Sequence, residues 1–405
     1  MQNSNLVQSI TQQFAVTYQY TTYFTERVFG LDNPLLARCV ESNWLPAKCL
    51  FVLDSGVAQA RQSLLEEIER YAEAYKQQIA YKGTLVIPGG EVAKNDTGLF
   101  KQVLEAIHLK GICRHSYLIG IGGGAVLDMV GFAAAIAHRG IRHIRIPTTV
   151  LSQNDSGVGV KNSFNLFGKK NFLGTFQPPT AVINDFCFLE TLSQRDWIAG
   201  IAEAIKVALI KEKTFFEEIE RNADQLVKRN QQAMQAIIYR CAELHMQHIA
   251  QGGDPFERGS ARPLDFGHWA AHKLESMSHY RLRHGEAVAI GMAIDCLYAH
   301  YQGFLAKPTV QRIFNLIQRL SLPLRAPEVF FKDAQGTYQV LKGIEEFREH
   351  LGGQLTITLI NDIGKSFNVH EICLKTMQDS IYNLEKMEFN DPAADFLQIS
   401  ENSWQ

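Results

Sequence analysis

At 405 residues, of which 46% are hydrophobic, the chain is long enough to form two domains that each bury a core. Its formal net charge of -2 excludes a broad basic surface for nucleic acid or an anionic membrane, so any anion site must be local. The N-terminus has no basic and apolar leader, and the seven cysteines are scattered without a CxxC pair, which predicts reduced thiols and a cytoplasmic location.

The first half of the chain alternates β-type and helical runs. Residues 1–45, which include FAVTYQYTTYFTERVF, are expected to form a β-hairpin or an extension at the edge of the sheet. Strand-like runs follow in CLFVLD, TLVIPGG, SYLIGIGGG and HIRIPTT. A helical pattern near 66–78 separates the first run from the second, and another near 99–109 separates the second from the third. That order is typical of a parallel sheet with crossover helices, so we expect an α/β domain over residues 1–185.

The second half is predicted to be mainly helical. From about residue 189 the β-type pattern fades, and long amphipathic segments follow at 197–222 and 231–251. A late strand-like run, QLTITLIN, precedes Gly364 and a helix-like run, EICLKTMQDSIYNLEKM. We therefore expect a mainly α-helical domain over residues 186–405.

A glycine turn follows one predicted strand, in YLIGIGGGAVLDMVGFAAA. Gly122, Gly123 and Gly124 separate the strand from a helix, so backbone N–H groups and a helix N-terminus face a common point. Such a turn suits a pyrophosphate, although a purely structural tight turn has the same pattern.

Charged side chains follow two further strand ends. Asp54 in VLDSG stands where an acidic side chain can accept ribose hydroxyls, and Glu91 and Lys94 follow the strand of IPGGEVAKN. Each alone is more often part of a solvated loop. Successive strand ends of one sheet line the crevice where open α/β sheets bind ligands, so together they indicate a dinucleotide site.

A polar segment, IPTTVLSQNDSGVGVKNSFNLFGKKNFLG, follows the last of these strands. Its glycines allow the backbone to approach a ligand closely, and its lysines supply charge for a phosphate; the alternative is a solvated basic loop. The polar residues are Thr148, Thr149, Asp155, Lys161, Lys169, Lys170 and Asn171.

Metal-binding residue types occur in the helical half. Glu203 and Lys206 lie at i and i+3 in the apolar helix DWIAGIAEAIKVALIKE, so they share a face that is expected to be buried rather than a surface ion pair. DFGHWAAHKLE places His268 and His272 on one helix face, and LRHGEAVAIGM supplies His284. Two histidines and Glu203 would leave zinc open positions for substrate oxygens, with the third histidine as an acid/base or outer group.

These motifs, in order and over about residues 50 to 300, resemble the dehydroquinate synthase superfamily of sugar phosphate cyclases. The matching runs are PGGE, GGG-AVLD, HRG, PTT, D-SGVGVK, GKKN, GIAEAIK, FGH-WAAH and HGEAVAIGM. The resemblance implies a Rossmann-like NAD-binding domain followed by a helical domain that binds zinc, or cobalt, and the substrate.

The resemblance also implies a role for each matching residue. The zinc ligands would be Glu203, His268 and His284. The NAD contacts would be Asp54, Glu91, Lys94, Gly123, Gly124, Asp128, Thr148, Thr149 and Lys170. The phosphorylated seven-carbon sugar would contact Asp155, Lys161, Asn171, Lys206 and His272, and Arg139 would reach into the partner subunit of a homodimer.

The implied reaction uses NAD catalytically. NAD takes a hydride from a ring hydroxyl, phosphate leaves by elimination, the hydride returns, the ring opens, and an intramolecular aldol closes the carbocycle, with zinc as a Lewis acid. The substrate phosphate can serve as the base.

The sequence departs from the synthase pattern where a substrate carboxylate would bind. Asp265 replaces an Asn, the expected Arg is displaced by one residue as Arg262, and the expected Lys falls near Gln247 or His248. EEFREHLGG stands in place of a basic C-terminal stretch. An anion near a carboxylate costs about 1–4 kcal/mol at effective dielectrics of 20 to 80. These departures resemble the branch that cyclises sedoheptulose 7-phosphate to valiolone-type products, although many members of that branch lack a histidine at the position of His272.

Three alternatives remain open from the sequence. A 3-dehydroquinate synthase would run the same reaction type on an acid substrate. A metal-dependent polyol or alcohol dehydrogenase of the glycerol-dehydrogenase fold would have no use for GKKN and Lys161. A binding protein without catalysis would not need all of Glu203, Lys206 and the three histidines, and its metal content would identify it.

Overall fold

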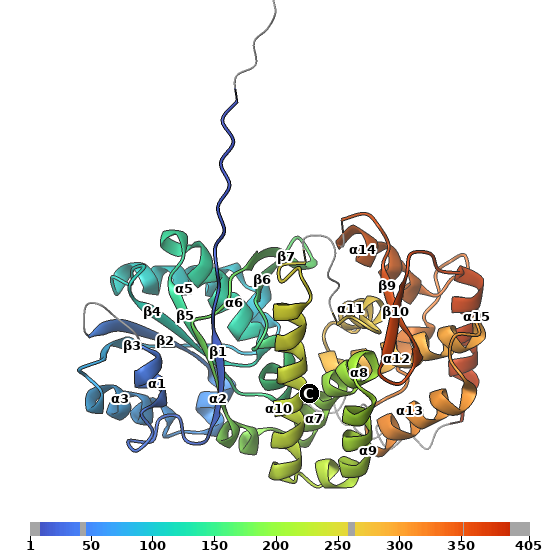
Figure 1. The fold of residues 1–405 in the computed structure, drawn as a ribbon, viewed down its shortest axis with the longest axis horizontal. Helices are drawn as coiled ribbons and strands as arrows, with labels where there is room; N and C mark the ends of the chain where they lie inside the picture. Colours follow the sequence, from blue (N-terminus) through green and yellow to red (C-terminus); the bar gives the residue numbers. More distant parts are fainter. Residues whose placement is uncertain (1–8, 41–45, 258–263, 351, 389–405) are drawn as a thin grey trace, which may run out of the picture.

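The computed structural model describes residues 9–40, 46–257, 264–350 and 352–388. Its centre is a six-stranded, fully parallel sheet with the strand order β1-β8-β5-β4-β2-β3 (Figure 1). The strands are β1 (Thr21–Thr25), β2 (Ala47–Asp54), β3 (Ile79–Ile87), β4 (Tyr117–Gly122), β5 (Arg142–Pro147) and β8 (Ala181–Asp185). Since β1 is an edge strand parallel to β8, the predicted extension at the edge of the sheet is confirmed, and the described residues of this segment form no hairpin.

Helices cover both faces of this sheet. Side chains of β2 alternate, so that Phe51 and Leu53 pack toward α3 while Leu50 and Val52 pack toward α5 and α6. The helices of this half are α1 (Leu35–Cys39), α2 (Ser55–Ala60), α3 (Leu64–Ala74), α4 (Val92–Asn95), α5 (Thr97–Leu109) and α6 (Gly124–Ile136). The predicted α/β architecture is confirmed, because crossover helices join the parallel strands.

The polar segment after β5 does not form the solvated loop that was the alternative interpretation. It begins with a π-helical turn at Ser152–Ser156 and continues as an antiparallel hairpin of β6 (Lys161–Leu166) and β7 (Lys169–Phe176). Phe164 is the buried side chain that the hairpin packs onto the helices beside the sheet. The hairpin thereby holds the predicted lysines on ordered strands.

The second half is helical, as predicted, around one large apolar core. The expected long helix of residues 197–222 is divided into three: one break falls at Gly200, and the other at Glu212, whose backbone is extended with φ of -156° and ψ of 113°. A strand, β10, joins the predicted late strand. The elements are α7 (Gln194–Ala199), α8 (Ile201–Lys211), α9 (Lys213–Val227), α10 (Gln231–Gln251), α11 (His268–Met277), α12 (His284–Tyr301), α13 (Lys307–Arg319), α14 (Lys342–His350), β9 (Ile357–Asp362), β10 (Lys365–Val369) and α15 (Leu374–Lys386).

Helix α10 lies where the sheet half and the helical half meet (Figure 1). It packs against the Ser152–Ser156 turn of the first half and against α8 and α9 of the second. The domain boundary between residues 185 and 186 stays a prediction. Among the described helices, none has both the length and the apolar character needed to cross a bilayer.

Candidate active site

The carboxyl ends of the parallel strands meet at one edge, and most of the predicted nucleotide residues lie there. Asp54 ends β2, Gly122 ends β4, and Thr148 follows β5. The backbone N–H of Thr148 donates to the carbonyl of Gly122 over 3.0 Å, which joins two of these ends. This is the crevice in which open α/β sheets bind ligands.

The glycine turn forms a cradle with unpartnered polar atoms beside it. Gly123 caps α6, and a Cβ at Gly124 would lie 2.5 Å from Ser156 Oγ, so only glycine fits that approach. The buried hydroxyls of Thr148 and Ser156 have no hydrogen-bond partner within the described structure. A helix N-terminus with free donors beside it suits the pyrophosphate of a dinucleotide, so these residues fit NAD. Thr149 is half-buried there and exchanges hydrogen bonds with Ser152.

Asp54 and Glu91 lie at the same edge with different surroundings. Asp54 accepts a hydrogen bond from the Gly56 N–H over 2.8 Å and lies so close to Gly89 that a Cβ there would be 2.2 Å from its carboxylate. Burial raises the Asp54 pKa above its usual value. Glu91 lies 3.7 Å from the Lys170 ammonium. The structure therefore turns Glu91 toward Lys170 and the helical half.

Lys94 is buried in one network with residues predicted for two different ligands. Its ammonium donates to Asp128 over 2.7 Å, to Ser163 over 2.8 Å and to the Asn171 side chain over 2.6 Å. Asn171 holds a left-handed backbone, with φ of 55°. The sequence assigned Lys94 and Asp128 to NAD and Asn171 to the substrate, whereas the hairpin brings all three together.

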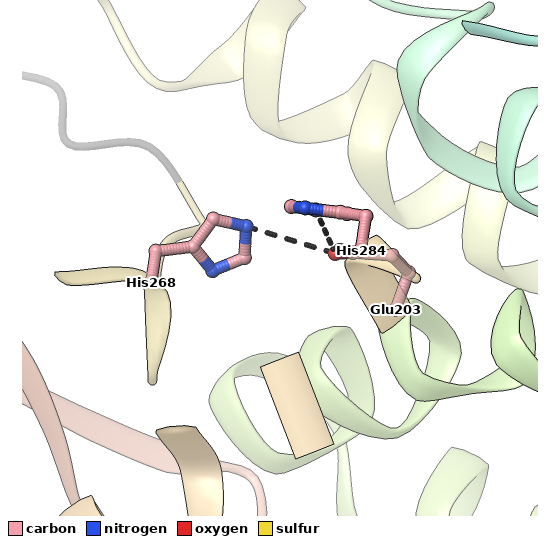
Figure 2. A group of neighbouring side chains, drawn as sticks. All are labelled: Glu203, His268 and His284. Carbon is pink, nitrogen blue, oxygen red and sulfur yellow. Dashed lines mark hydrogen bonds and ion pairs between the residues drawn. The ribbon is translucent and has the colours of Figure 1, made fainter. Parts of the chain in front are cut away.

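Three predicted metal ligands converge from three helices (Figure 2). Glu203 comes from α8, His268 begins α11, and His284 begins α12. The Glu203 Oε1 atom lies 3.1 Å from His284 Nε2 and 3.6 Å from His268 Nε2, and the three donor atoms lie within 4.8 Å of one another. One carboxylate and two imidazoles in this arrangement fit a zinc ion with open positions.

A close helix crossing places two of these histidines. Gly267 precedes α11 with φ of +79°, and a Cβ on it would lie 2.5 Å from Met292 N in α12. Asp295 of α12 accepts from the Gly267 N–H over 3.0 Å and from the Trp269 indole over 2.8 Å. The left-handed glycine and the Asp295 anchor set the position at which His268 enters the site.

The charges behind the metal position balance one another. Glu203 is fully buried and forms an ion pair with Lys206, as the shared helix face predicted. Burial opposes the charge of Glu203, but Lys206 and His284 lower its pKa, and Glu203 with Asp155 raises the pKa of Lys206. Burial and Lys206 hold the His268 pKa well below its usual value, so its imidazole is neutral, as a metal ligand must be.

Glu275 is a site residue that the sequence reasoning missed. It accepts a bond from His284 Nδ1 over 3.1 Å and from the Lys170 ammonium over 2.7 Å. Burial opposes the charge of Glu275, but Lys170 and His284 lower its pKa. Burial also opposes the charge of Lys170, but Glu275 and Glu91 raise its pKa. A carboxylate on the second nitrogen of a ligand histidine orients the ring. The i+7 spacing from His268 was the available signal.

Two consequences follow from the position of Glu275. Lys170 was predicted to contact NAD, but it lies between Glu275 and Glu91 and so links the hairpin to the metal helices. Glu275, His272 and His284 form a second set of three possible ligands. Burial holds the pKa of His272 well below its usual value, so its imidazole is neutral.

His245 of α10 is the second missed residue. Its Nδ1 atom lies 2.9 Å from the Asp155 carboxylate, and burial of that carboxylate is offset because Lys206 and His245 lower its pKa. The sequence placed Gln247 or His248 in the site, which is wrong: Gln247 is exposed, and His248 Nδ1 contacts Lys211 over 3.0 Å. Of these three residues of α10, only His245 points toward the site.

Asp265 lies in the helical half of the chain, close enough to Lys161 for their charges to interact. Its carboxyl accepts a hydrogen bond from the Thr358 hydroxyl over 2.6 Å, and burial raises its pKa to about 6. Lys161 is half-exposed and pairs with Glu257 over 2.7 Å, while its charge still acts on Asp265. Lys169 lies at the surface, 3.5 Å from Glu349.

Of the two arginines named from the sequence, Arg139 is not brought into the site of its own chain. Arg139 is exposed beyond the far end of α6, and a 13-residue helix is about 20 Å long, so Arg139 does not meet the cradle of its own chain. Its reach into a partner subunit stays a prediction. Arg262 falls outside the described residues.

Comparison with known proteins places this geometry in context. Residues 84–199 match the model of the 3-dehydroquinate synthase N-terminal domain, and residues 200–343 match that of the 3-dehydroquinate synthase C-terminal domain. A 3-dehydroquinate synthase of Shewanella frigidimarina (strain NCIMB 400) is 36% identical over 318 residues, which are 76% of this chain and 86% of that protein.

Two solved structures are similar along most of the chain. ValA (2-epi-5-epi-valiolone synthase) from Streptomyces hygroscopicus subsp. jinggangensis 5008, with NAD+ and Zn2+ bound, has a TM-score of 0.82 at 27% identity and covers 94% of this chain and 100% of its own. A 2-deoxy-scyllo-inosose synthase complexed with carbaglucose-6-phosphate, NAD+ and Co2+ has a TM-score of 0.74 at 22% identity, covering 89% and 96%, and shows the fold alone.

Proposed function

This chain belongs to the 3-dehydroquinate synthase family, and from that premise we propose that it is a sugar phosphate cyclase acting on sedoheptulose 7-phosphate, with a valiolone-type cyclitol as product. In this reaction phosphate leaves by β-elimination between a transient oxidation and its reversal, and an aldol closes the ring. The enzyme is then a carbon–oxygen lyase in which NAD is regenerated in each turnover.

The residues of this chain fit both cofactors. NAD would lie on the Gly123 and Gly124 cradle, and Glu203, His268 and His284 would hold zinc or cobalt. When bound, NAD supplies a reversible hydride acceptor and the metal supplies a Lewis acid for a substrate oxygen.

The other polar residues bind and orient the sugar. Asp155, which Lys206 and His245 keep ionised, is placed to accept a hydrogen bond from a substrate hydroxyl. His272 is neutral and can give or take a proton beside the metal ligands. Lys161 is the cation available for the phosphate, because it is half-exposed and its partner Glu257 is only partly buried.

The buried carboxyl of Asp265 carries the choice of substrate. It lies three residues before His268, and at neutral pH it is mostly an anion, which repels a substrate carboxylate. Among the described residues, three lysines around the site already pair with carboxylates, Lys161 is assigned to the phosphate, and α10 contributes His245 in place of a lysine. The paired lysines are Lys94, Lys170 and Lys206. A neutral hydroxymethyl ketone end fits this charge distribution better than an acid.

A 3-dehydroquinate synthase activity is the second candidate, because relatives at 34–36% identity carry that name. It would require a cation for the substrate carboxylate. Arg262, which the sequence places at a displaced position, is the residue that could supply it.

One experiment separates the candidates. The protein is incubated with NAD, zinc and either sedoheptulose 7-phosphate or 3-deoxy-arabino-heptulosonate 7-phosphate, and released phosphate is measured. We expect phosphate from the neutral sugar and at least about 10²-fold less from the acid. Release from the acid at an equal or higher rate would establish the dehydroquinate reaction, and net accumulation of NADH would indicate a dehydrogenase.

The assembly and location are part of the proposal. A homodimer in which Arg139 enters the partner's site is consistent with its exposed position at the far end of α6. A cytoplasmic location is consistent with the seven cysteines, none of which forms a disulfide in the structure.

A further inference from the structure

A buried threonine of β9 bonds the carboxyl group on which the proposed choice of substrate depends. The Thr358 hydroxyl donates to Asp265 Oδ1 over 2.6 Å, and both side chains are buried. The two residues are 93 positions apart in the chain, and Asp265 lies just before α11. They meet because the hairpin of β9 and β10 packs against α8 and α12, which carry two of the proposed metal ligands.

Thr358 is a polar residue in an apolar strand. Its neighbours Ile357 and Leu359 belong to the large core of the helical half, and Thr358 itself is 5% exposed. A buried hydroxyl destabilises a fold unless it is hydrogen-bonded, and a valine would fill nearly the same space without that requirement. The threonine at this position therefore indicates that its hydroxyl has a use, and the bond to Asp265 supplies one.

The position of the hairpin is fixed by α8. The turn between β9 and β10 contains Gly364, whose backbone has φ of +78° and whose N–H donates to the Leu209 carbonyl of α8 over 2.8 Å. A Cβ on Gly364 would lie 2.5 Å from Lys213 N, so only glycine allows this close approach. Thr358 therefore reaches Asp265 from a strand that is anchored to α8.

The contact with Thr358 leaves one oxygen of Asp265 as an acceptor. Among the described residues, no donor other than Thr358 bonds this carboxyl group, and the bond is to Oδ1. The charges of Lys161 and Lys206, which the sequence assigned to the substrate, act on the same carboxyl group, so it lies beside the proposed sugar site. With Oδ1 fixed, Oδ2 is the acceptor that remains for a substrate hydroxyl.

We propose that Thr358 is a positioning residue for substrate choice, which holds Oδ1 of Asp265 so that Oδ2 accepts the hydroxyl of the substrate's hydroxymethyl end. A carboxylate accepts a hydrogen bond from an alcohol and repels a second carboxylate, so one fixed oxygen selects for the neutral sugar and against the acid. This inference deepens the proposed function and rests on it, because it concerns the neutral end of that substrate.

The test replaces the hydroxyl by a methyl group of similar size. With sedoheptulose 7-phosphate, Thr358→Val should raise KM about 10- to 10²-fold, because the hydrogen bond to a charged acceptor is lost and Asp265 is no longer held. The kcat value should change less than about twofold, since the hydroxymethyl hydroxyl does not react and contributes uniform binding. A loss of folded protein would instead lower the apparent kcat and leave KM unchanged.

Two further variants isolate the hydroxyl and its partner. Thr358→Ser restores the donor and should return KM to within a few-fold of the wild-type value. When Asp265→Ala is already present, Thr358→Val should raise KM no further, because the hydroxyl acts through Asp265. Rates are measured as released phosphate with NAD and zinc present.

Thr356→Val is the matched control on the same strand segment. Thr356 is buried two residues earlier, and its hydroxyl lies 3.2 Å from His370 Nδ1, so the same change there should leave KM unaltered. An unchanged KM in Thr358→Val, an equal rise in both valine variants, or no recovery in Thr358→Ser would overturn the inference alone. A wild type that prefers 3-deoxy-arabino-heptulosonate 7-phosphate would overturn the proposed function and this inference together.

Discussion

The Nδ1 atom of His245 lies 2.9 Å from the carboxylate of Asp155, and this contact joins a helix of the second half to the turn that follows β5. Lys206 also lowers the pKa of Asp155, so residues of two helices stabilise this carboxylate, which we propose binds the substrate. A histidine that bonds a site carboxylate can both orient it and relay a proton.

The first prediction concerns this pair. His245→Ala should lower kcat about 10²-fold, because Asp155 loses the imidazole that orients it and shares its proton. Zinc content and NAD affinity should stay as in the wild type, since His245 contacts neither predicted cofactor site. Met246→Ala, on the next residue of α10, is the control. A full rate in His245→Ala would reduce the contact to a packing role.

The second prediction concerns the metal. His268→Ala should weaken zinc binding by more than about 10²-fold, because the loss of an outer partner alone costs 10–100-fold. Zinc per chain is measured by atomic absorption after dialysis against a chelator. His300→Ala is the control, because His300 bonds the Leu305 carbonyl and lies outside both sets of possible ligands. Equal zinc in both variants would remove His268 from the ligand set.

The third prediction concerns the cradle. A Cβ on Gly123 would lie 3.4 Å from the Thr149 methyl, an ordinary contact, and its φ of -73° suits any residue. Gly123→Val should therefore fold normally yet block NAD, because its methyl groups occupy the position of the pyrophosphate. Calorimetric titration with NAD measures the loss, and an unchanged zinc content shows that the helical half is intact. Unaltered NAD affinity would mean that the turn is only structural.

The fourth prediction is a pH dependence from Asp265. Burial raises its pKa to about 6, so the group is neutral below that pH and anionic above it. Discrimination against the acid substrate should therefore fall as the pH falls through about 6, on the order of tenfold for one lost charge. The ratio of phosphate release from the two substrates measures this, because titration of the phosphate affects both alike. In Asp265→Asn the ratio should be low and independent of pH.

The fifth prediction concerns a buried arginine in β5. The Arg145 guanidinium donates to the carbonyls of Gly157, Gly159 and Lys161 and to the Asn162 side chain. It therefore holds the backbone between Asp155 and Lys161 in place.

Replacing this arginine leaves buried acceptors without a donor. Arg145→Met should lower the free energy of unfolding by about 3–5 kcal/mol and slow turnover through misplaced Asp155 and Lys161. Urea unfolding gives the first value. Arg142→Met is the control, since Arg142 is half-buried over the Tyr117 ring and should cost about 1 kcal/mol. Equal losses in the two variants would contradict a special role for Arg145.

Local order in the sequence determined much of this protein. The alternation of strands and helices predicted the parallel sheet, because period and turn residues are properties of short segments. The i, i+3 spacing of Glu203 and Lys206 in an apolar helix predicted their burial, and the glycine turn predicted the cradle. The three candidate metal ligands were also identifiable, since residue types that bind metals are few.

The tertiary structure decided which distant groups meet. His245 and Glu275 carry no motif of their own, and they became site residues only when α10 and α11 packed beside Asp155 and Lys170. The hairpin of β6 and β7 likewise joined Asn171 to Lys94, which the sequence had assigned to another ligand. Such contacts depend on the relative positions of whole elements, and burial of apolar surface sets these positions over distances that no local pattern encodes.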